Sequence, residues 1–150
     1  MQADSIVQRF PDLRVASIRL HWSLPYPRPA RKLEPQNAKN DLWGWVQQDS
    51  VADAFLRCIT LPDGTFKGHE VFYIAAPEIA NPALDSKKLR EEFWPDVPVK
   101  EGWDVSGATG FFDCTKAKEI LGWVHTYTPS PEDDEDAYVE TTKAQLLLLT

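Results

Sequence analysis

The feature that most limits how this sequence can fold is an uninterrupted apolar run, Val71–Ala76 (VFYIAA). The run has the length of one strand, and such runs are typical of strands covered on both faces of a parallel sheet. Val15–Leu20 (VASIRL) alternates between apolar and polar residues and predicts a second strand. Trp45–Gln47 predicts a short third one. Because helical patterns separate these strands, the sequence predicts the α/β class.

Four segments have the apolar spacing of helices: Ala3–Phe10, Ser50–Thr60, Asp85–Phe93 and Thr115–Leu121. In the second of these, we expect Asp49 or Ser50 to be the N-cap. We also expect its apolar residues Ala54, Phe55, Cys58 and Ile59 to face the core. Residues 23–41 contain four prolines and predict a long irregular loop.

Composition restricts the class of partner. The length of 150 residues predicts one domain, and the formal net charge of −7 argues against nucleic acid and against anionic membranes. Cys58 and Cys114 show no metal-ligand spacing, so we interpret them as buried free thiols of a reducing cytoplasm. The N-terminus has no apolar signal region, and the run Leu146–Leu149 is too short to span a bilayer.

The stretch Val105–Phe112 superficially has the glycine spacing of a dinucleotide-binding loop. Gly107 and Gly110 fit that spacing, but Asp113 stands where the third glycine is needed for close helix–strand packing. The preceding residues are too polar for a buried strand. We therefore expect no nucleotide cofactor here, and we interpret the end of this stretch as a helix that begins after Asp113 and stops at Gly122.

Several stretches together resemble the C-terminal half of the extended short-chain dehydrogenase/reductases, the NAD-dependent epimerase/dehydratase family. The stretches that carry the resemblance are Val15–Leu20, Trp45–Ala54, Gly68–Ala76, Ser86–Leu89 and Asp113–Trp123. The last is similar to the family pattern Asp-x-Ser-Lys-Ala-x-x-x-Leu-Gly-Trp. The resemblance implies a truncated remnant of the family's fold over residues 1–128, beginning just beyond the catalytic helix. Residues 129–150 would form an acidic linker and a helical tail.

The chain departs from the family at the residues that carry its chemistry. None of its four tyrosines is followed four positions later by lysine, so the family's catalytic Tyr-x-x-x-Lys pair is missing. Trp43 stands where nucleotide-sugar enzymes of the family have an arginine. The resemblance therefore implies a substrate lobe without NAD chemistry. Its sheet would need a cover, for which we expect a homodimer, with the tail Val139–Leu149 or a separate partner chain as alternatives.

Candidate site residues gather after the first strand. His21 and Arg19 lie at its end, where a titratable imidazole beside an arginine could move a proton on a bound small molecule. Asp49 and Asp113 could supply a carboxylate, although both are also simple helix caps. Aromatic side chains expected to line a pocket are Trp22, Tyr26, Trp43, Trp45 and Trp103. The competing interpretation is that His21 is a hydrogen-bonded strand-end histidine and the tryptophans only fill space.

Three functions remain open on the sequence. The first is a small-molecule-binding domain which, if catalytic, would be a cofactor-independent isomerase, cyclase or dehydratase acting on an apolar metabolite. The second is half of a split NAD(P)-dependent enzyme completed by another chain. The third is a non-catalytic interaction module. No His, Asp or Glu grouping has the spacing of a metal site.

Overall fold

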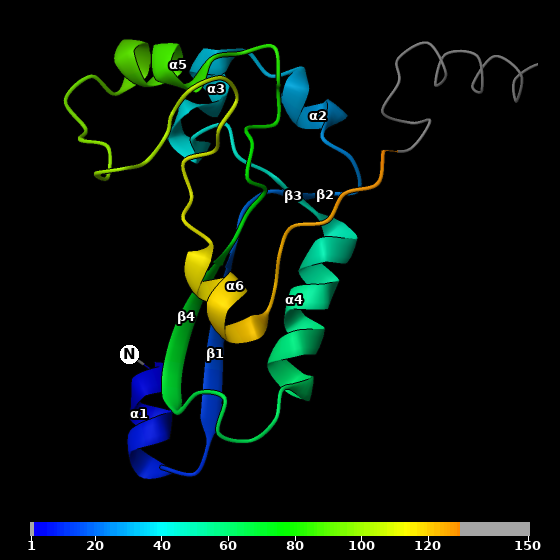
Figure 1. Ribbon diagram of the computed structural model, residues 1–150, viewed down its shortest axis with the longest axis vertical. Helices are drawn as coiled ribbons and strands as arrows, with labels where there is room; N and C mark the ends of the chain where they lie inside the picture. Colours follow the sequence, from blue (N-terminus) through cyan, green and yellow to red (C-terminus); the bar gives the residue numbers. More distant parts are fainter. Residues whose placement is uncertain (1, 130–150) are drawn as a thin grey trace, which may run out of the picture.

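The computed structural model describes residues 2–129, and its centre is a two-stranded parallel sheet. Strand β1 (Arg14–Leu20) pairs with β4 (Gly68–Ile74) in a register that runs from Arg14 opposite Gly68 to Leu20 opposite Ile74. Helix α4 (Gln48–Thr60) lies between the two strands in sequence and runs along the sheet on the β1 side (Figure 1). The molecule is therefore of the mixed α/β class, as expected.

One face of this sheet carries the main hydrophobic core. Helix α6 (Thr115–Leu121) covers β4 and packs against α4, so both helices close the same face. Phe72 of β4 and Trp123, which follows α6, are almost fully buried there. The indole nitrogen of Trp123 donates to the carbonyl oxygen of Ser50 at 2.8 Å, which ties the end of α6 to the start of α4. Burial of large side chains of this kind contributes roughly 1.5–3 kcal/mol each.

On the opposite face, helix α1 (Gln2–Arg9) covers one end of the sheet. His69 of β4 links that helix to β1, because Nδ1 contacts an Asp4 carboxylate oxygen at 2.9 Å and Nε2 contacts Ser17 Oγ at 2.8 Å. Further along β4, Tyr73 is 42% exposed. Phe72, Ile74, Ala75 and Ala76 are buried, so the expectation that the run Val71–Ala76 is covered on both faces fails only at Tyr73 and in part at Val71.

A second lobe sits beyond the carboxyl ends of β1 and β4 (Figure 1). It contains the small parallel pair β2 (Ser23–Leu24) and β3 (Val46–Gln47) and helix α5 (Ser86–Phe93). The segment predicted as an irregular loop contains two short helices, α2 (Arg28–Arg31) and α3 (Pro35–Ala38), and the 3-10 turn η1 (Lys39–Asp41). That prediction is corrected because two of its prolines occupy the first turns of α2 and α3, where proline favours a helix.

The starts of two helices differ from the prediction. The N-cap of α6 is Cys114, which makes no side-chain cap, and not Asp113. Helix α4 is capped by Gln47, whose side-chain oxygen accepts from the backbone N–H groups of Asp49 at 2.5 Å and Ser50 at 2.9 Å. Asp49 and Ser50 are therefore donors inside the helix and not its cap. Asp85 caps α5. Gly122 ends α6 in the left-handed conformation with φ of 64°, and this end was expected.

The inward face of α4 also differs from the prediction. Ala54 is buried and Cys58 packs against the core, but Phe55 is 46% and Ile59 is 78% exposed. These two side chains lie on a second apolar face of the helix, together with Leu56. In residues 2–129, no helix has both the length and the apolar character that crossing a membrane requires. The predicted acidic linker and the tail Val139–Leu149 lie outside the described residues, apart from Pro129.

Candidate functional site: an apolar pocket and an adjoining hollow

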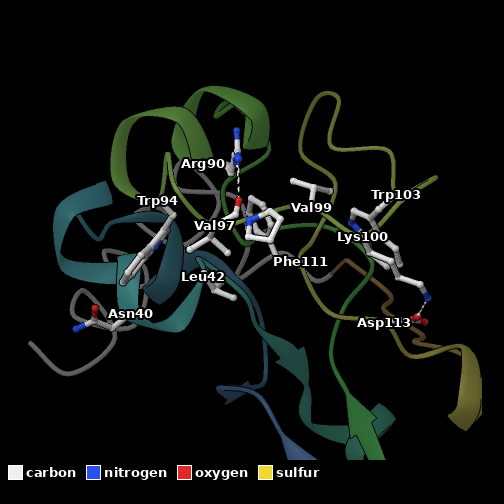
Figure 2. A pocket seen from close by; sticks show the side chains of 11 residues that line it. Asn40, Leu42, Arg90, Trp94, Val97, Val99, Lys100, Trp103, Phe111 and Asp113 are labelled. Atoms are coloured by element: carbon white, nitrogen blue, oxygen red, sulfur yellow. Dashed lines mark hydrogen bonds and ion pairs between the residues drawn. The ribbon is translucent and has the colours of Figure 1, made fainter.

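A cavity with a mainly apolar lining lies in the second lobe, between η1, α5 and the segment 94–103. It has a volume of about 470 Å³, within the usual range for small-molecule sites, and Figure 2 shows its side chains converging from these elements. We call it the apolar pocket, and its apolar lining residues are Leu42, Trp94, Val97, Pro98, Val99, Trp103 and Phe111.

Both tryptophans of the apolar pocket are fixed by hydrogen bonds to backbone carbonyls. Trp94 Nε1 donates to the carbonyl oxygen of Lys39 at 3.1 Å, and Trp103 Nε1 donates to that of Gly110 at 3.2 Å. Because an indole has only this one donor, both rings are satisfied and offer apolar surface to a ligand. The walls are in place before any ligand arrives.

The segment between the two tryptophans is held by Arg90 of α5. Its Nη2 donates to the carbonyl oxygens of Pro95 at 3.0 Å and Val97 at 2.7 Å, and its Nε donates to the latter at 3.2 Å (Figure 2). The buried Leu89 next to it anchors α5 in its own hydrophobic cluster. Arg90 thus fixes the loop that forms one wall of the pocket.

An ion pair stands at the rim of the apolar pocket. Lys100 Nζ lies 2.6 Å from Asp113 Oδ2, and Asp113 Oδ1 accepts from the backbone N–H of Thr115 at 3.0 Å. The hydrogen bond from Lys100 and those from Thr115 lower the pKa of Asp113 from 3.8 to about 2. The carboxyl group is therefore ionised near neutral pH, so it is not a proton donor there.

A second hollow of about 560 Å³ adjoins the pocket, because Phe111 and Asp113 line both. We call it the adjoining hollow; Arg19, Tyr73, Phe112 and Lys116 also line it. Arg19 Nη1 donates to the Tyr73 hydroxyl at 2.7 Å, and the guanidinium carbon lies 5.4 Å from the centre of that ring. Arg19, one of the predicted site residues, is therefore held in one orientation at the carboxyl end of β1.

His21 uses both of its ring nitrogens in structural hydrogen bonds. Its Nδ1 accepts from the backbone N–H of Trp22 at 2.7 Å, and its Nε2 donates to the carbonyl oxygen of Asp41 at 2.6 Å. Burial lowers the pKa of the imidazole, although the bond to Asp41 opposes that shift. The ring also packs edge-on against Phe112 at 4.7 Å. This is the geometry of a hydrogen-bonded strand-end histidine, and a catalytic role for His21 stays a prediction.

The aromatic residues predicted to share one pocket are distributed over several places. Trp103 lines the apolar pocket, whereas Trp43 is buried against Phe93 and Phe111, and its indole donates to the carbonyl oxygen of Pro35 at 2.8 Å. Trp22 is exposed beside His21 in a separate shallow hollow. Trp22 and Trp43 line one small cavity of about 10 Å³, but Trp103 does not reach it, so the three side chains do not share a cavity.

Three further predicted residues lie near the start of α4 or just after β2. Trp45 is buried and packs edge-on against His125 and Tyr127, each at 5.2 Å. Asp49 accepts a hydrogen bond from the Gln47 amide at 3.1 Å. Tyr26, which follows β2, is half-buried and lines none of the cavities described above.

His125 is an unusual imidazole that the sequence did not single out. Its Nε2 accepts from the backbone N–H of Gln47 at 3.2 Å, and burial lowers its pKa from 6.5 to about 4. Beside it, the buried hydroxyl of Tyr127 has no hydrogen-bond partner among the described residues. Neither His125 nor Tyr127 lines the apolar pocket or the adjoining hollow.

Of the two glycines in the stretch Val105–Phe112, Gly110 serves close packing, whereas Gly107 has open space around it and adopts a φ of 57°. Gly110 donates its N–H to the carbonyl oxygen of Pro77 at 2.7 Å, and a Cβ there would lie 3.0 Å from that oxygen. In the described part of the chain, no strand precedes this loop directly and α6 starts only at Thr115. The arrangement is not the strand–turn–helix that holds a dinucleotide phosphate.

The described residues contain no cluster of three or more His, Cys, Asp or Glu side chains that could hold a metal ion. Cys58 and Cys114 are both free and half-buried, and burial raises the pKa of each thiol. Neither thiol is therefore activated as a nucleophile.

Sequence reasoning missed most of the apolar pocket. Its key segment, WPDVPVKEGW over residues 94–103, alternates valine with proline between two tryptophans in a stretch without helix or strand. Apolar residues in such a segment do not stabilise a helix or a strand. Their presence there was the available sign that the segment lines a pocket. No family model matches the chain, and no curated protein is similar to it.

Proposed function

We propose that the protein is a small-molecule-binding domain whose ligand places an apolar body in the apolar pocket. The observation that carries the proposal is the fixed wall: two satisfied indoles and a loop held by Arg90 border an open cavity of about 470 Å³. Binding then requires little ordering of the protein, which favours affinity.

We further propose that the chain derives from the substrate lobe of the NAD-dependent epimerase/dehydratase family. The parallel pairing of β1 with β4, with α4 between them in sequence, is compatible with that origin. The loop at Gly107–Gly110 offers no support for a bound nucleotide, so this proposal includes no nicotinamide chemistry.

Binding is a better-supported function than catalysis. His21 is engaged at both ring nitrogens, and Asp113, the carboxylate of the apolar pocket, is ion-paired. If the domain catalyses a reaction, it would be a cofactor-independent isomerisation, cyclisation or dehydration in which the pocket contributes by positioning its substrate and excluding water.

The test uses the neutral fluorophore N-phenyl-1-naphthylamine, which brightens on entering an apolar site. Val97 lines the apolar pocket and is 51% exposed, while Val124 is 50% exposed and does not line it. We expect Val97→Glu to weaken fluorophore binding about tenfold, since a buried charge opposes an apolar ligand, and Val124→Glu to change it less than about twofold. No binding by the wild-type protein, or equal losses in the two variants, would overturn the proposal.

A second candidate function, an interaction module, is favoured by the surface of α4 and β1. In the described structure, β1 pairs only with β4, so the backbone groups along its other edge are not paired within a sheet. Helix α4, which contacts β1, carries an exposed apolar face. Such surfaces associate readily, and a second copy of the chain remains our proposal for the cover.

A further inference from the structure

The net charge of the side chains that line the two cavities is positive, whereas the net charge of the whole chain is negative. Arg90 and Lys100 line the apolar pocket, Arg19 and Lys116 line the adjoining hollow, and Asp113 is the carboxylate lining both. Four cations and one carboxylate thus surround the site of a chain whose formal net charge is −7. A local excess of positive charge in a negative protein selects for an anionic ligand.

Within the described residues, only Arg19 is free of a carboxylate and also keeps most of its donors available. Lys100 pairs with Asp113 at 2.6 Å, and Lys116 pairs with Glu70 at 2.5 Å. Arg90 spends Nε and Nη2 on backbone carbonyls. Arg19 makes no ion pair in the described residues, and its one hydrogen bond, to Tyr73, leaves most of its donors available.

Tyr73 prepares Arg19 for binding in two ways. Its hydroxyl fixes one guanidinium nitrogen at 2.7 Å, and its ring lies under the guanidinium carbon at 5.4 Å. A guanidinium held in this way loses little freedom when it binds an anion through two parallel hydrogen bonds. Phe112, whose ring centre lies 6.3 Å from that of Tyr73, adds apolar surface to the adjoining hollow.

We propose that the ligand is an amphiphilic anion: its apolar body fills the apolar pocket, and its carboxylate or phosphate lies in the adjoining hollow against Arg19. The Lys100–Asp113 pair stands where the two cavities meet and borders the junction between the two parts of the ligand. This inference rests on the proposed function, because the apolar pocket must bind the body of the ligand.

The experiment displaces N-phenyl-1-naphthylamine from the wild-type protein with three ligands of equal chain length: laurate, dodecyl phosphate and dodecanol. All are used below their micellar concentrations. We expect the better of the two anions to displace the fluorophore at about fivefold lower concentration than dodecanol, the scale of a partly exposed charge-assisted hydrogen bond. The anion that displaces the fluorophore at the lower concentration, laurate or dodecyl phosphate, identifies the anionic group of the ligand. High salt should reduce the advantage of the anion.

Variants separate Arg19 from general electrostatics. Arg19→Met should remove the advantage of the anion and leave dodecanol unchanged, and Tyr73→Phe should reduce the advantage about twofold by releasing the guanidinium. Lys116→Met is the matched control, because it removes a positive charge from the same hollow. Glu70 already compensates that charge in the wild-type protein. It should change the advantage by less than about twofold.

The outcomes distinguish the two proposals. If the fluorophore does not bind, the proposed function and this inference both fail. If the fluorophore binds but dodecanol is as effective as either anion, or Arg19→Met and Lys116→Met have equal effects, the apolar pocket stands and the anion site is overturned.

Discussion

The ammonium nitrogen of Lys100 lies 2.6 Å from a carboxylate oxygen of Asp113, and the second oxygen of that carboxylate receives the backbone N–H of Thr115. One side chain therefore joins the loop after α5 to the first turn of α6. Asp113 lies outside both helices and fixes the rim between the apolar pocket and the adjoining hollow. The pair is largely exposed, so its contribution is positional more than energetic.

This pair predicts an acid-dependent loss of stability. The pKa of Asp113 falls from 3.8 to about 2 in the folded state, so the unfolded chain takes up a proton first as the pH falls. The stabilisation is present above pH about 4 and disappears as the pH falls through about 2. Asp113→Asn should lower the melting temperature at pH 6 and reduce its fall between pH 4 and 2. Parallel curves for variant and wild type across that window would contradict the assignment.

His125 predicts a pH effect in a different window. Burial holds its pKa at about 4 against an ordinary 6.5, and its Nε2 must be unprotonated to accept from Gln47. Between pH about 6.5 and 4, the unfolded chain therefore binds a proton that the folded chain excludes. The free energy of unfolding decreases as the pH is lowered through that range. His125→Gln should flatten this part of the stability curve. An NMR titration that places the ring near 6.5 in the folded protein would show that the imidazole is not held neutral.

Gly110 predicts a packing defect. A Cβ at this position would lie 3.0 Å from the carbonyl oxygen of Pro77 and 3.2 Å from that of Ala76, both backbone atoms that cannot turn aside. Gly110→Ala should therefore destabilise the fold by about 1–3 kcal/mol, measured by urea unfolding. Because Phe111 follows directly and lines the apolar pocket, the variant should also weaken fluorophore binding. Unchanged stability would mean that the close approach of the two segments is not needed.

Local patterns in the sequence predicted the regular elements well. The strands at Arg14–Leu20 and Gly68–Ile74 and the helices at Ser86–Phe93 and Thr115–Leu121 lie within a few residues of the predictions. Periodicity and caps are properties of neighbouring residues, so one segment is enough to reveal them. The error in α4 has the same origin. Phe55 and Ile59 fit a helical stripe as well as Ala54 and Cys58 do, and periodicity cannot tell which stripe meets the sheet.

The candidate site was less predictable because it depends on loops. Trp43 and Trp103 are both tryptophans in segments predicted as loops. In the structure, Trp43 is buried against Phe93, whereas Trp103 lines the apolar pocket. Trp43 is placed by packing against Phe93 and Phe111, which are distant in sequence. The neighbouring wall of the pocket likewise depends on the hydrogen bond from Trp94 to the carbonyl of Lys39. Arg19 was identified because the end of a parallel strand is a position fixed by topology.

The exposed stripe of α4 predicts self-association. Phe55, Leu56 and Ile59 together present an apolar surface on the side of the sheet where β1 has no further strand within the described residues. We expect the full chain to be a dimer by size-exclusion chromatography with light scattering at micromolar concentration. Ile59→Glu should shift it towards the monomer and change the stability of each subunit by less than about 0.5 kcal/mol, because the side chain is 78% exposed. Val124→Glu, with the same change of charge elsewhere on the surface, should remain dimeric. If the wild-type protein is a monomer and gains no solubility from Ile59→Glu, the stripe is not an interface between copies.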